Sequence, residues 1–575
     1  MKIGGITLKV NGERTKALIE MISGFTRSRG SKSYRELVEK LIAHLRRIGV
    51  PSTSINIKEY ACDGVTKYGN YTSTMVWEPI KAELWLKKPR EQFITSFRNS
   101  PTALLFGSAA TNGWAELQLV EYKGPGDYAG KAVLAKEDPV KVFKDAVVNG
   151  GAKALILSYM RGKCPEIGRE PKTNPDVVNY LSIPNTLEDY NYRAFGFSIS
   201  EKHFNFLKKL LGKNSVVVIN AEVETKVMKG SIQVLEIDLT KKQNPYVLIT
   251  AHLCHPSPGA NDNASGSALA LELAGIISKE KGFPPTKIAL MPEFFGSTPY
   301  ALEMKRESSM PFLTINLDMV GEDQKKTGSS LLLTETPPVL PKRYDFLLEY
   351  NLLKHMPRCD GIPIKRYYRL PYSAGSDHCP FTAMGVSSPF LGHLPDRYYH
   401  TDADSPDKVD CKELEWVGNS VLDSLLELIS TNPKLDAYIK SKEVSEFVYY
   451  CENIRGKPGS RELFSSFLKA FEARKHGFDS LYSQNSFIHS RKKLIPNFEG
   501  SIGFDWYYAL PEQLKKTLNL NVTSLAELIT VSANIIGSRE STELLAEIYY
   551  GVPQKAVSGF IDFLVDNGYF MEGEF

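Results

Sequence analysis

The residues best suited to metal or acid–base chemistry gather in one short stretch, ITAHLCHPSPGANDNASGSALALELAG, at 249–275. Within eleven residues it places His252, Cys254, His255 and Asp262, between an apolar run and a segment of small side chains. Imidazole, thiolate and carboxylate are the groups by which proteins bind Zn²⁺ and similar divalent ions. The stretch therefore predicts a metal site, with a redox or nucleophilic role for Cys254 as the alternative.

Further candidate residues accompany the later apolar runs of the chain. Glu293 follows KIALMP, Asp318 lies within FLTINLDMV, and His400 lies in the polar segment RYYHTDADSP. Asp377 and His378 lie together in YSAGSDHCPF. Each of these alone has an ordinary explanation, since an Asp at a strand end is more often a helix cap or a solvated residue. In an open parallel sheet, however, ligands bind beyond the carboxyl ends of the strands, so several such residues together favour a metal site.

The elements that would position these residues change in character along the chain. Apolar residues have helical spacing in 31–49, and 130–159 predicts a strand, a helix, a Gly-Gly turn and a strand. From 226 to 435, apolar runs such as YVLITAHL alternate with helical stretches. This alternation predicts an α/β fold with a mostly parallel sheet and helices on both faces. The chain from 436 to 575 is helical and more irregular.

Composition and charge exclude several classes of protein. The chain of 575 residues has 70 basic and 66 acidic residues, a net charge of +4, which argues against a nucleic-acid-binding protein. Residues 516–575 contain three basic and eight acidic side chains, a net charge of −5, so this tail is not expected to bind DNA. The seven cysteines are widely spaced without a CxxC motif, and no long apolar run predicts a membrane span. We expect a cytoplasmic protein with reduced thiols.

The first motif also carries a family resemblance. AHLCHPSPGANDNASG resembles the H-x-D … G-A-x-D-N-x-S-G signature of the zinc aminopeptidases related to glutamate carboxypeptidase and the transferrin receptor, and EFFGST, NLDMVG, SDH and YHTDADSPDKVD continue the resemblance in order. The resemblance implies four parts: an N-terminal part of the peptidase domain in 1–75, a β-rich insert similar to the protease-associated domain in 76–225, the catalytic zinc-binding domain in 226–435, and a winged-helix-like domain in 436–575.

The resemblance further implies zinc ions held by histidines and carboxylates. His252 and Asp318 would bind one ion, Glu293 and His400 would bind the other, and Asp262 would bridge the two. Asp377 and His378 are expected to contact the ligand residues rather than the metal ions. A carboxylate would take a proton from water and pass it to the leaving amine.

Two departures from the family pattern leave alternatives open. Pro292 stands where the first of two tandem glutamates is usual, so Glu293 is either the general base or a ligand, and the site holds one zinc ion or two. Cys254 replaces the orienting aspartate of H-x-D. His255 is an alternative to His252 as a ligand, although the spacing to Asp262 favours His252.

The resemblance implies an aminopeptidase that removes N-terminal residues from short peptides. A single-zinc relative that cyclises N-terminal glutamine is one alternative, and a non-catalytic binding or scaffold protein is another. Lys365, Arg366 and Arg369 could bind the carboxylate of a peptide or could form a solvated basic loop. The sequence leaves the substrate residue and the oligomeric state open, including a homo-oligomer.

Overall fold

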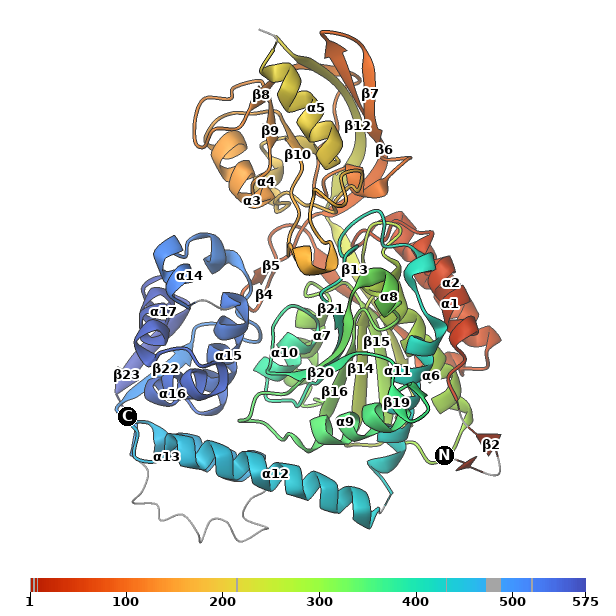
Figure 1. The fold of residues 1–575 in the computed structure, drawn as a ribbon, viewed down its shortest axis with the longest axis vertical. Helices are drawn as coiled ribbons and strands as arrows, with labels where there is room; N and C mark the ends of the chain where they lie inside the picture. The colour runs from red at the N-terminus through yellow and green to blue at the C-terminus, as the bar shows by residue number, and fades with distance from the viewer. Residues whose placement is uncertain are drawn as a thin grey trace.

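The largest of the three bodies in Figure 1 is built on a mixed eight-stranded sheet. The computed structural model describes residues 2–3, 6–7, 9–213, 216–430, 432–471, 488–518 and 521–574. In order across the sheet, the strands are β20 (Tyr367–Leu370), β17 (Ser330–Thr334), β21 (Phe390–Leu394), β16 (Leu313–Leu317), β14 (Val247–His252), β15 (Thr286–Met291), β13 (Gly230–Asp238) and β3 (Ile55–Cys62). The central strands β21, β16, β14 and β15 are parallel, as the sequence predicts, whereas β13 and β3 add antiparallel partners at one side.

Helices cover both faces of this sheet because alternate residues of its buried strands point to opposite sides. Val247, Ile249 and Ala251 of β14 pack in the core that includes α1 (Gly12–Ser23), α2 (Lys32–Arg47), α6 (Gly266–Lys279), α9 (Arg343–His355) and α11 (Cys411–Glu427). Leu248 and the alternate residues of β15 pack on the other side against α7 (Ser297–Arg306) and α10 (His378–Ala383). The helix that the sequence predicts in 31–49 is α2.

A second body lies above the first in Figure 1 and is built on a seven-stranded sheet. Its strands, in order, are β11 (Phe195–Ser198), β10 (Ala154–Leu157), β9 (Ala132–Ala135), β8 (Ala115–Glu121), β12 (Val218–Met228), β6 (Val76–Lys88) and β7 (Gln92–Ser96). The strand–helix–strand pattern predicted in 130–159 is β9, α3 (Pro139–Val142) with its helical continuation to Val148, and β10. The chain leaves the first sheet after β3 and returns to it at β13, which is the neighbour of β3.

The third body is mainly helical and follows a long helix, α12 (Pro433–Ile454), that runs beneath the others in Figure 1. Its core joins α13 (Ser460–Ala470), α15 (Val522–Ile535), α16 (Arg539–Tyr550) and α17 (Gln554–Asp566) to a hairpin of β22 (Lys492–Pro496) and β23 (Phe570–Glu574). Gly551, in the left-handed region, ends α16 and begins the tight turn predicted before α17. Among the described helices, none combines the length and apolar character needed to cross a membrane.

Candidate metal centre

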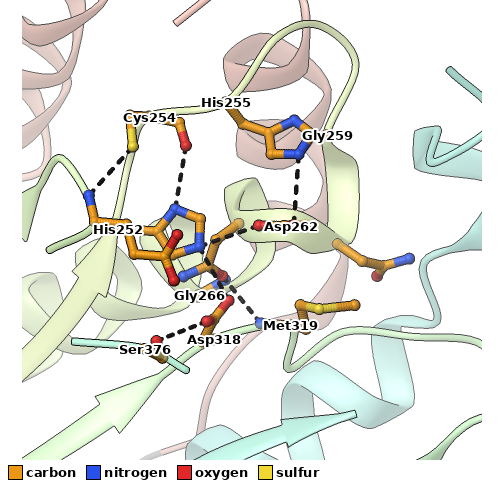
Figure 2. Close-up of polar contacts among 12 residues, drawn as sticks. His252, Cys254, His255, Gly259, Asp262, Gly266, Asp318, Met319 and Ser376 are labelled. Atoms are coloured by element: carbon orange, nitrogen blue, oxygen red, sulfur yellow. Dashed lines mark hydrogen bonds and ion pairs between the residues drawn. The ribbon is translucent and has the colours of Figure 1, made fainter. Parts of the chain in front are cut away.

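Two groups of metal-ligating side chains share Asp262, and we refer to them as the first and second triads. The first triad is His252, Asp262 and Asp318, and the second is His255, Asp262 and His400. The Nε2 atom of His252 lies 3.0 Å from Asp262 Oδ1 and 3.2 Å from Asp318 Oδ1. The other carboxylate oxygen of Asp262, Oδ2, lies 3.0 Å from His400 Nε2 and 3.4 Å from His255 Nε2. Each oxygen of Asp262 therefore faces a different set of partners, of which Figure 2 shows His252 and His255.

The parallel strands explain why these residues meet. His252 is the last residue of β14, and Asp318 directly follows β16 beside it. Asp262 lies in the irregular helical turn Ala260–Ser265 that leads into α6, and His400 lies in the loop after β21. All these segments lie at or beyond the carboxyl ends of adjacent parallel strands, the edge where ligands bind in sheets of this kind.

His255 is positioned by a short antiparallel bridge to the N-terminal part of the chain. The amide of Arg27 donates to the carbonyl of His255 at 2.8 Å, and the amide of His255 donates to the carbonyl of Arg27 at 3.2 Å. The buried guanidinium of Arg27 also donates to the carbonyls of Leu253 and Gly259. The loop between His252 and Asp262 is therefore anchored to the turn that joins α1 and α2.

Two glycines of the first motif allow close approaches that a side chain would block. At Gly259, φ is +48° and a Cβ atom would lie 2.3 Å from Nδ1 of His255. At Gly266, the first residue of α6, a Cβ atom would lie 2.2 Å from the carbonyl oxygen of Leu317 in β16. The first glycine lets the loop pass beneath His255, and the second lets α6 pack directly against β16.

Three residues near the triads that are not glycines also have positive φ. They are Phe294 after Glu293, Met319 after Asp318, and His400 itself, with φ of 56°, 63° and 54°. Such conformations are costly outside glycine and cluster at functional sites in proteins. The strained backbone at three separate segments supports a functional role for this edge of the sheet.

Hydrogen bonds fix the orientation of the triads. The carbonyl of Cys254 lies 3.2 Å from Nδ1 of His252, which leaves Nε2 facing Asp262 and Asp318. The hydroxyl of Ser376 donates to Asp318 Oδ2 at 2.7 Å. The carboxylate of Asp404 accepts from the amide of Asp262 at 3.0 Å.

The electrostatics of the site favour a cation between the triads. Burial acts to raise the pKa of Asp262, but His255, His252 and His400 hold that pKa well below its usual value. Burial acts to lower the pKa of His252, but Asp318 and Glu293 raise that pKa well above its usual value. Burial lowers the pKa of His400 to about 4, so its imidazole is neutral near pH 7. The carboxylates thus attract positive charge, and a neutral imidazole is available to bind it.

The donor set fits zinc. Apart from their contacts within the triads, His255 Nε2 and Asp318 Oδ1 are buried without a hydrogen-bond partner among the described residues. Buried polar atoms of this kind are usually satisfied, so each is free to bind an ion. Histidine nitrogens with carboxylate oxygens are common zinc ligands, and each triad supplies three of them.

Glu293 belongs to neither triad. Its backbone amide donates to the thiol of Cys254 at 3.2 Å, so Cys254 supports the Glu293 segment as well as His252. Burial raises the pKa of Glu293 well above its usual value; His252 opposes this shift, and the carboxylates of Asp318 and Asp377 add to it.

Asp377 and His378 lie behind this segment and outside the triads. Asp377 Oδ1 accepts from the amide of Phe294 at 3.0 Å and from the hydroxyl of Ser297 at 2.6 Å. His378 faces the carbonyl of Ser373 at 2.8 Å instead. Asp377 thus holds the residue after Glu293, and His378 is part of the packing around α10.

Three further residues contribute to the site, and they were not among those expected from the sequence. Tyr180 comes from the second body, and its ring lies 5.0 Å from that of His255 and 5.4 Å from that of His400. Tyr399 stacks on His400 with a centroid distance of 3.9 Å. Tyr180 is too distant from the motifs in the sequence for a spacing pattern to reveal it. Tyr399 and Asp404, in contrast, lie in the recognised segment around His400 and could have been selected there.

The basic residues considered for peptide binding are engaged elsewhere. Lys365 forms ion pairs with Asp410 and Glu413 at 2.7 and 2.8 Å. The guanidinium of Arg366 donates to the carbonyls of Gln324 and Ser329. Arg369 pairs with three glutamates, Glu335, Glu349 and Glu446. All three side chains are therefore engaged by groups of this chain, although Arg366 is exposed.

Part of the chain is similar to known peptidases. Residues 234–425 match the model of peptidase family M28. Aminopeptidase YwaD of Bacillus subtilis is 27% identical over 218 residues, which cover 34% of this chain and 43% of that protein. A protein of Clostridium acetobutylicum named as a polysaccharide biosynthesis protein with an aminopeptidase-like domain is 31% identical over 243 residues, covering 40% of this chain and 48% of that protein. The chain thus spans less than half the length of the curated relatives that it matches.

A solved structure shows a similar fold. BSAP, a zinc aminopeptidase from Bacillus subtilis, superposes with a TM-score of 0.50 at 18% identity, covering 74% of this chain and 96% of that one. The matched segment, 234–425, contains strands β14 to β16 and all five residues of the two triads. Residues 234–425 of this chain are therefore similar to peptidase family M28.

Proposed function

We propose that the protein is a zinc-dependent aminopeptidase that removes N-terminal residues from short peptides. The observation that carries the proposal is the pair of triads that share Asp262 at the carboxyl edge of the sheet. The relatives named above as aminopeptidases support the same activity. Two triads also favour hydrolysis over a single-zinc cyclase, and intact ligands favour an enzyme over a scaffold protein.

We assign the ligands from the two triads. His252 and Asp318 would hold one zinc ion, His255 and His400 the other, and Asp262 would bridge them. This assignment differs from the sequence-based expectation in one position, because His255 takes the place that was expected for Glu293. A histidine ligand in the motif would compensate for the missing second glutamate at Pro292.

Glu293 is then available as the general base. When bound, zinc polarises a carbonyl group and makes water a stronger acid. The carboxylate of Glu293 would take the proton of the attacking water and pass it to the amine that leaves. The hydrogen bond from its amide to Cys254, together with the two that Asp377 makes behind it, would keep its backbone in place during this transfer.

The second body would limit the size of the substrate. Tyr180 covers the histidines of the second triad, and the amide of Tyr180 donates to the carbonyl of His400 at 2.7 Å. A cover of this kind leaves little room for a folded protein beside the triads. We further propose that this body is a protease-associated-like insert, that the third body is a winged-helix-like packing module, and that the protein acts in the cytoplasm.

The substitution Glu293→Gln tests the proposal when zinc content and peptide hydrolysis are measured together. We expect kcat to fall by about 10²- to 10⁴-fold, the usual contribution of a general base, with the zinc content unchanged at about two ions per chain. Glu307→Gln, at an exposed position beyond α7, is the matched control. Loss of zinc from Glu293→Gln would make Glu293 a ligand, and a zinc-loaded wild type without peptidase activity would refute the function.

A further inference from the structure

The turn between α1 and α2 presents two arginines beside the second triad, and their environments differ. Arg27 is fully buried, and its guanidinium donates to several backbone carbonyls, including those of Leu253 and Gly259. Arg29, two residues later, makes no hydrogen bond or ion pair with any residue that the structure describes, and its Nε atom is buried without a partner. One arginine therefore holds the loop together, and the other is free.

Two aromatic rings hold Arg29 in place without satisfying its hydrogen-bonding groups. Its Cζ atom lies 4.6 Å from the ring centroid of Phe106 and 4.2 Å from that of Phe295. Phe106 comes from the second body, and Phe295 lies two residues after Glu293. Rings above a guanidinium stabilise its charge and fix its plane, while the edge with its N–H donors stays available.

Arg29 faces a pocket that reaches the second triad. The pocket has a cavity volume of about 20 Å³ and opens to solvent, and Arg29, Phe106, Tyr180, Cys254 and His255 are among its lining residues. Other arginines in comparable surroundings are paired, as Arg369 is with three glutamates. An unpaired guanidinium beside a candidate catalytic centre is complementary to a carboxylate.

We propose that Arg29 binds a carboxylate of the peptide substrate and thereby makes the enzyme selective for short acidic or free-carboxylate peptides. The inference rests on the proposed peptidase function and specifies its substrate class. The planar guanidinium can bind a carboxylate through two parallel hydrogen bonds, and the aromatic rings would fix the orientation of that pair. The carboxylate can come from the C-terminus of a dipeptide or from the side chain of an acidic residue.

The experiment compares matched substrates on the zinc-loaded full-length wild type and on Arg29→Met. Ala-Ala against Ala-Ala-amide tests the C-terminal carboxylate, and Glu-p-nitroanilide against Gln-p-nitroanilide tests the side-chain carboxylate. In one of these two pairs, we expect the ratio of kcat/KM for the charged to the neutral substrate to fall about 10- to 100-fold in Arg29→Met. This range corresponds to a hydrogen-bonded charged group. Arg46→Met, at an exposed position of α2, is the control and should keep both ratios.

The outcomes separate this inference from the peptidase proposal. Unchanged ratios for both pairs in Arg29→Met would overturn the role of Arg29 while leaving the peptidase activity established. If the wild type hydrolyses none of the four compounds, calorimetric titration with Ala-Glu replaces the rate measurement. Binding at least about 10-fold tighter to the wild type than to Arg29→Met would support the carboxylate site, and equal binding would refute it.

Discussion

At the scale of single residues, Asp262 is the centre of the site because three histidines approach its two carboxylate oxygens. The distances are 3.0 Å to His252, 3.4 Å to His255 and 3.0 Å to His400. One carboxylate that faces two sets of ligands is suited to bridging two ions. In the proposed ligand set, His255 takes the place expected for Glu293, so its removal discriminates between a site for one ion and a site for two.

We expect His255→Ala to reduce the zinc content from about two ions per chain to about one. The first triad keeps its three ligands, whereas the second retains only Asp262 and His400. Peptidase activity should fall about 100-fold or more, because a metal ion contributes several kcal/mol to catalysis. Metal analysis by mass spectrometry measures the first effect and hydrolysis of Ala-p-nitroanilide the second.

The control for this substitution is His489→Ala. His489 pairs with Glu462 at an exposed position of the third body, so its removal should change neither the zinc content nor the activity. Two zinc ions retained in His255→Ala would show that another residue completes the second site, and Glu293 would be the first candidate.

The sequence predicts the strand-end residues of the site better than it predicts their partners. His252, Asp262, Asp318 and His400 lie together, as expected for motifs that follow parallel strands. The place of His255 depends on the antiparallel bridge to Arg27, and a contact across more than two hundred residues leaves no local pattern. Tyr180 and Arg29 are unpredictable for the same reason.

At the scale of elements, the loop between β14 and α6 carries most of the site. It contributes His255 and Asp262, and it pairs with the turn after α1. At Gly259 its backbone closely approaches other residues of the same loop. Because Gly259 lies against both His255 and the carbonyl of Asp262, the conformation of this loop and the geometry of the second triad depend on each other.

We expect Gly259→Ala to lower both the stability and the zinc content. The added Cβ atom would lie 2.3 Å from His255 Nδ1 and 2.5 Å from the carbonyl oxygen of Asp262, so the loop must shift. Gly361→Ala is the matched control, since Gly361 also has positive φ, +82°, but open space around the added atom. In the control, the free energy of unfolding should fall by about 1 kcal/mol and the zinc content should stay unchanged. Equal effects of the two substitutions on zinc content would contradict the close-approach argument.

The prediction of elements from sequence succeeds where periodicity is local. α2, β14 and the turn from α16 to α17 follow from helical spacing, an apolar run and glycine-proline signals. The order of strands does not follow, because β17 pairs antiparallel to β21 across the intervening residues 335–389. The pairing of β13 with both β15 and β3 likewise depends on the assembly of the whole sheet and not on the sequence of a single strand.

At the scale of the whole molecule, a buried ion network attaches α12 to the sheet-containing body. Lys342, at the start of α9, is fully buried, and its Nζ atom lies 2.8 Å from Glu335 and 3.1 Å from Glu446 of α12. Arg369 of β20 joins the same two glutamates. Since α12 leads into the third body, this network helps to fix the position of that body beside the sheet-containing body (Figure 1).

We expect Lys342→Met to weaken this attachment by about 3–5 kcal/mol, because it leaves two largely buried carboxylates with too little positive charge. Calorimetry should show an earlier first unfolding transition, and limited proteolysis should cleave near α12 faster than in the wild type. Lys58→Met is the control: Lys58 pairs with Glu303 at 2.6 Å in a partly exposed position, and its loss should cost about 1 kcal/mol or less. If both variants unfold at the wild-type temperature, α12 is held by its apolar contacts with α9 rather than by the ion network.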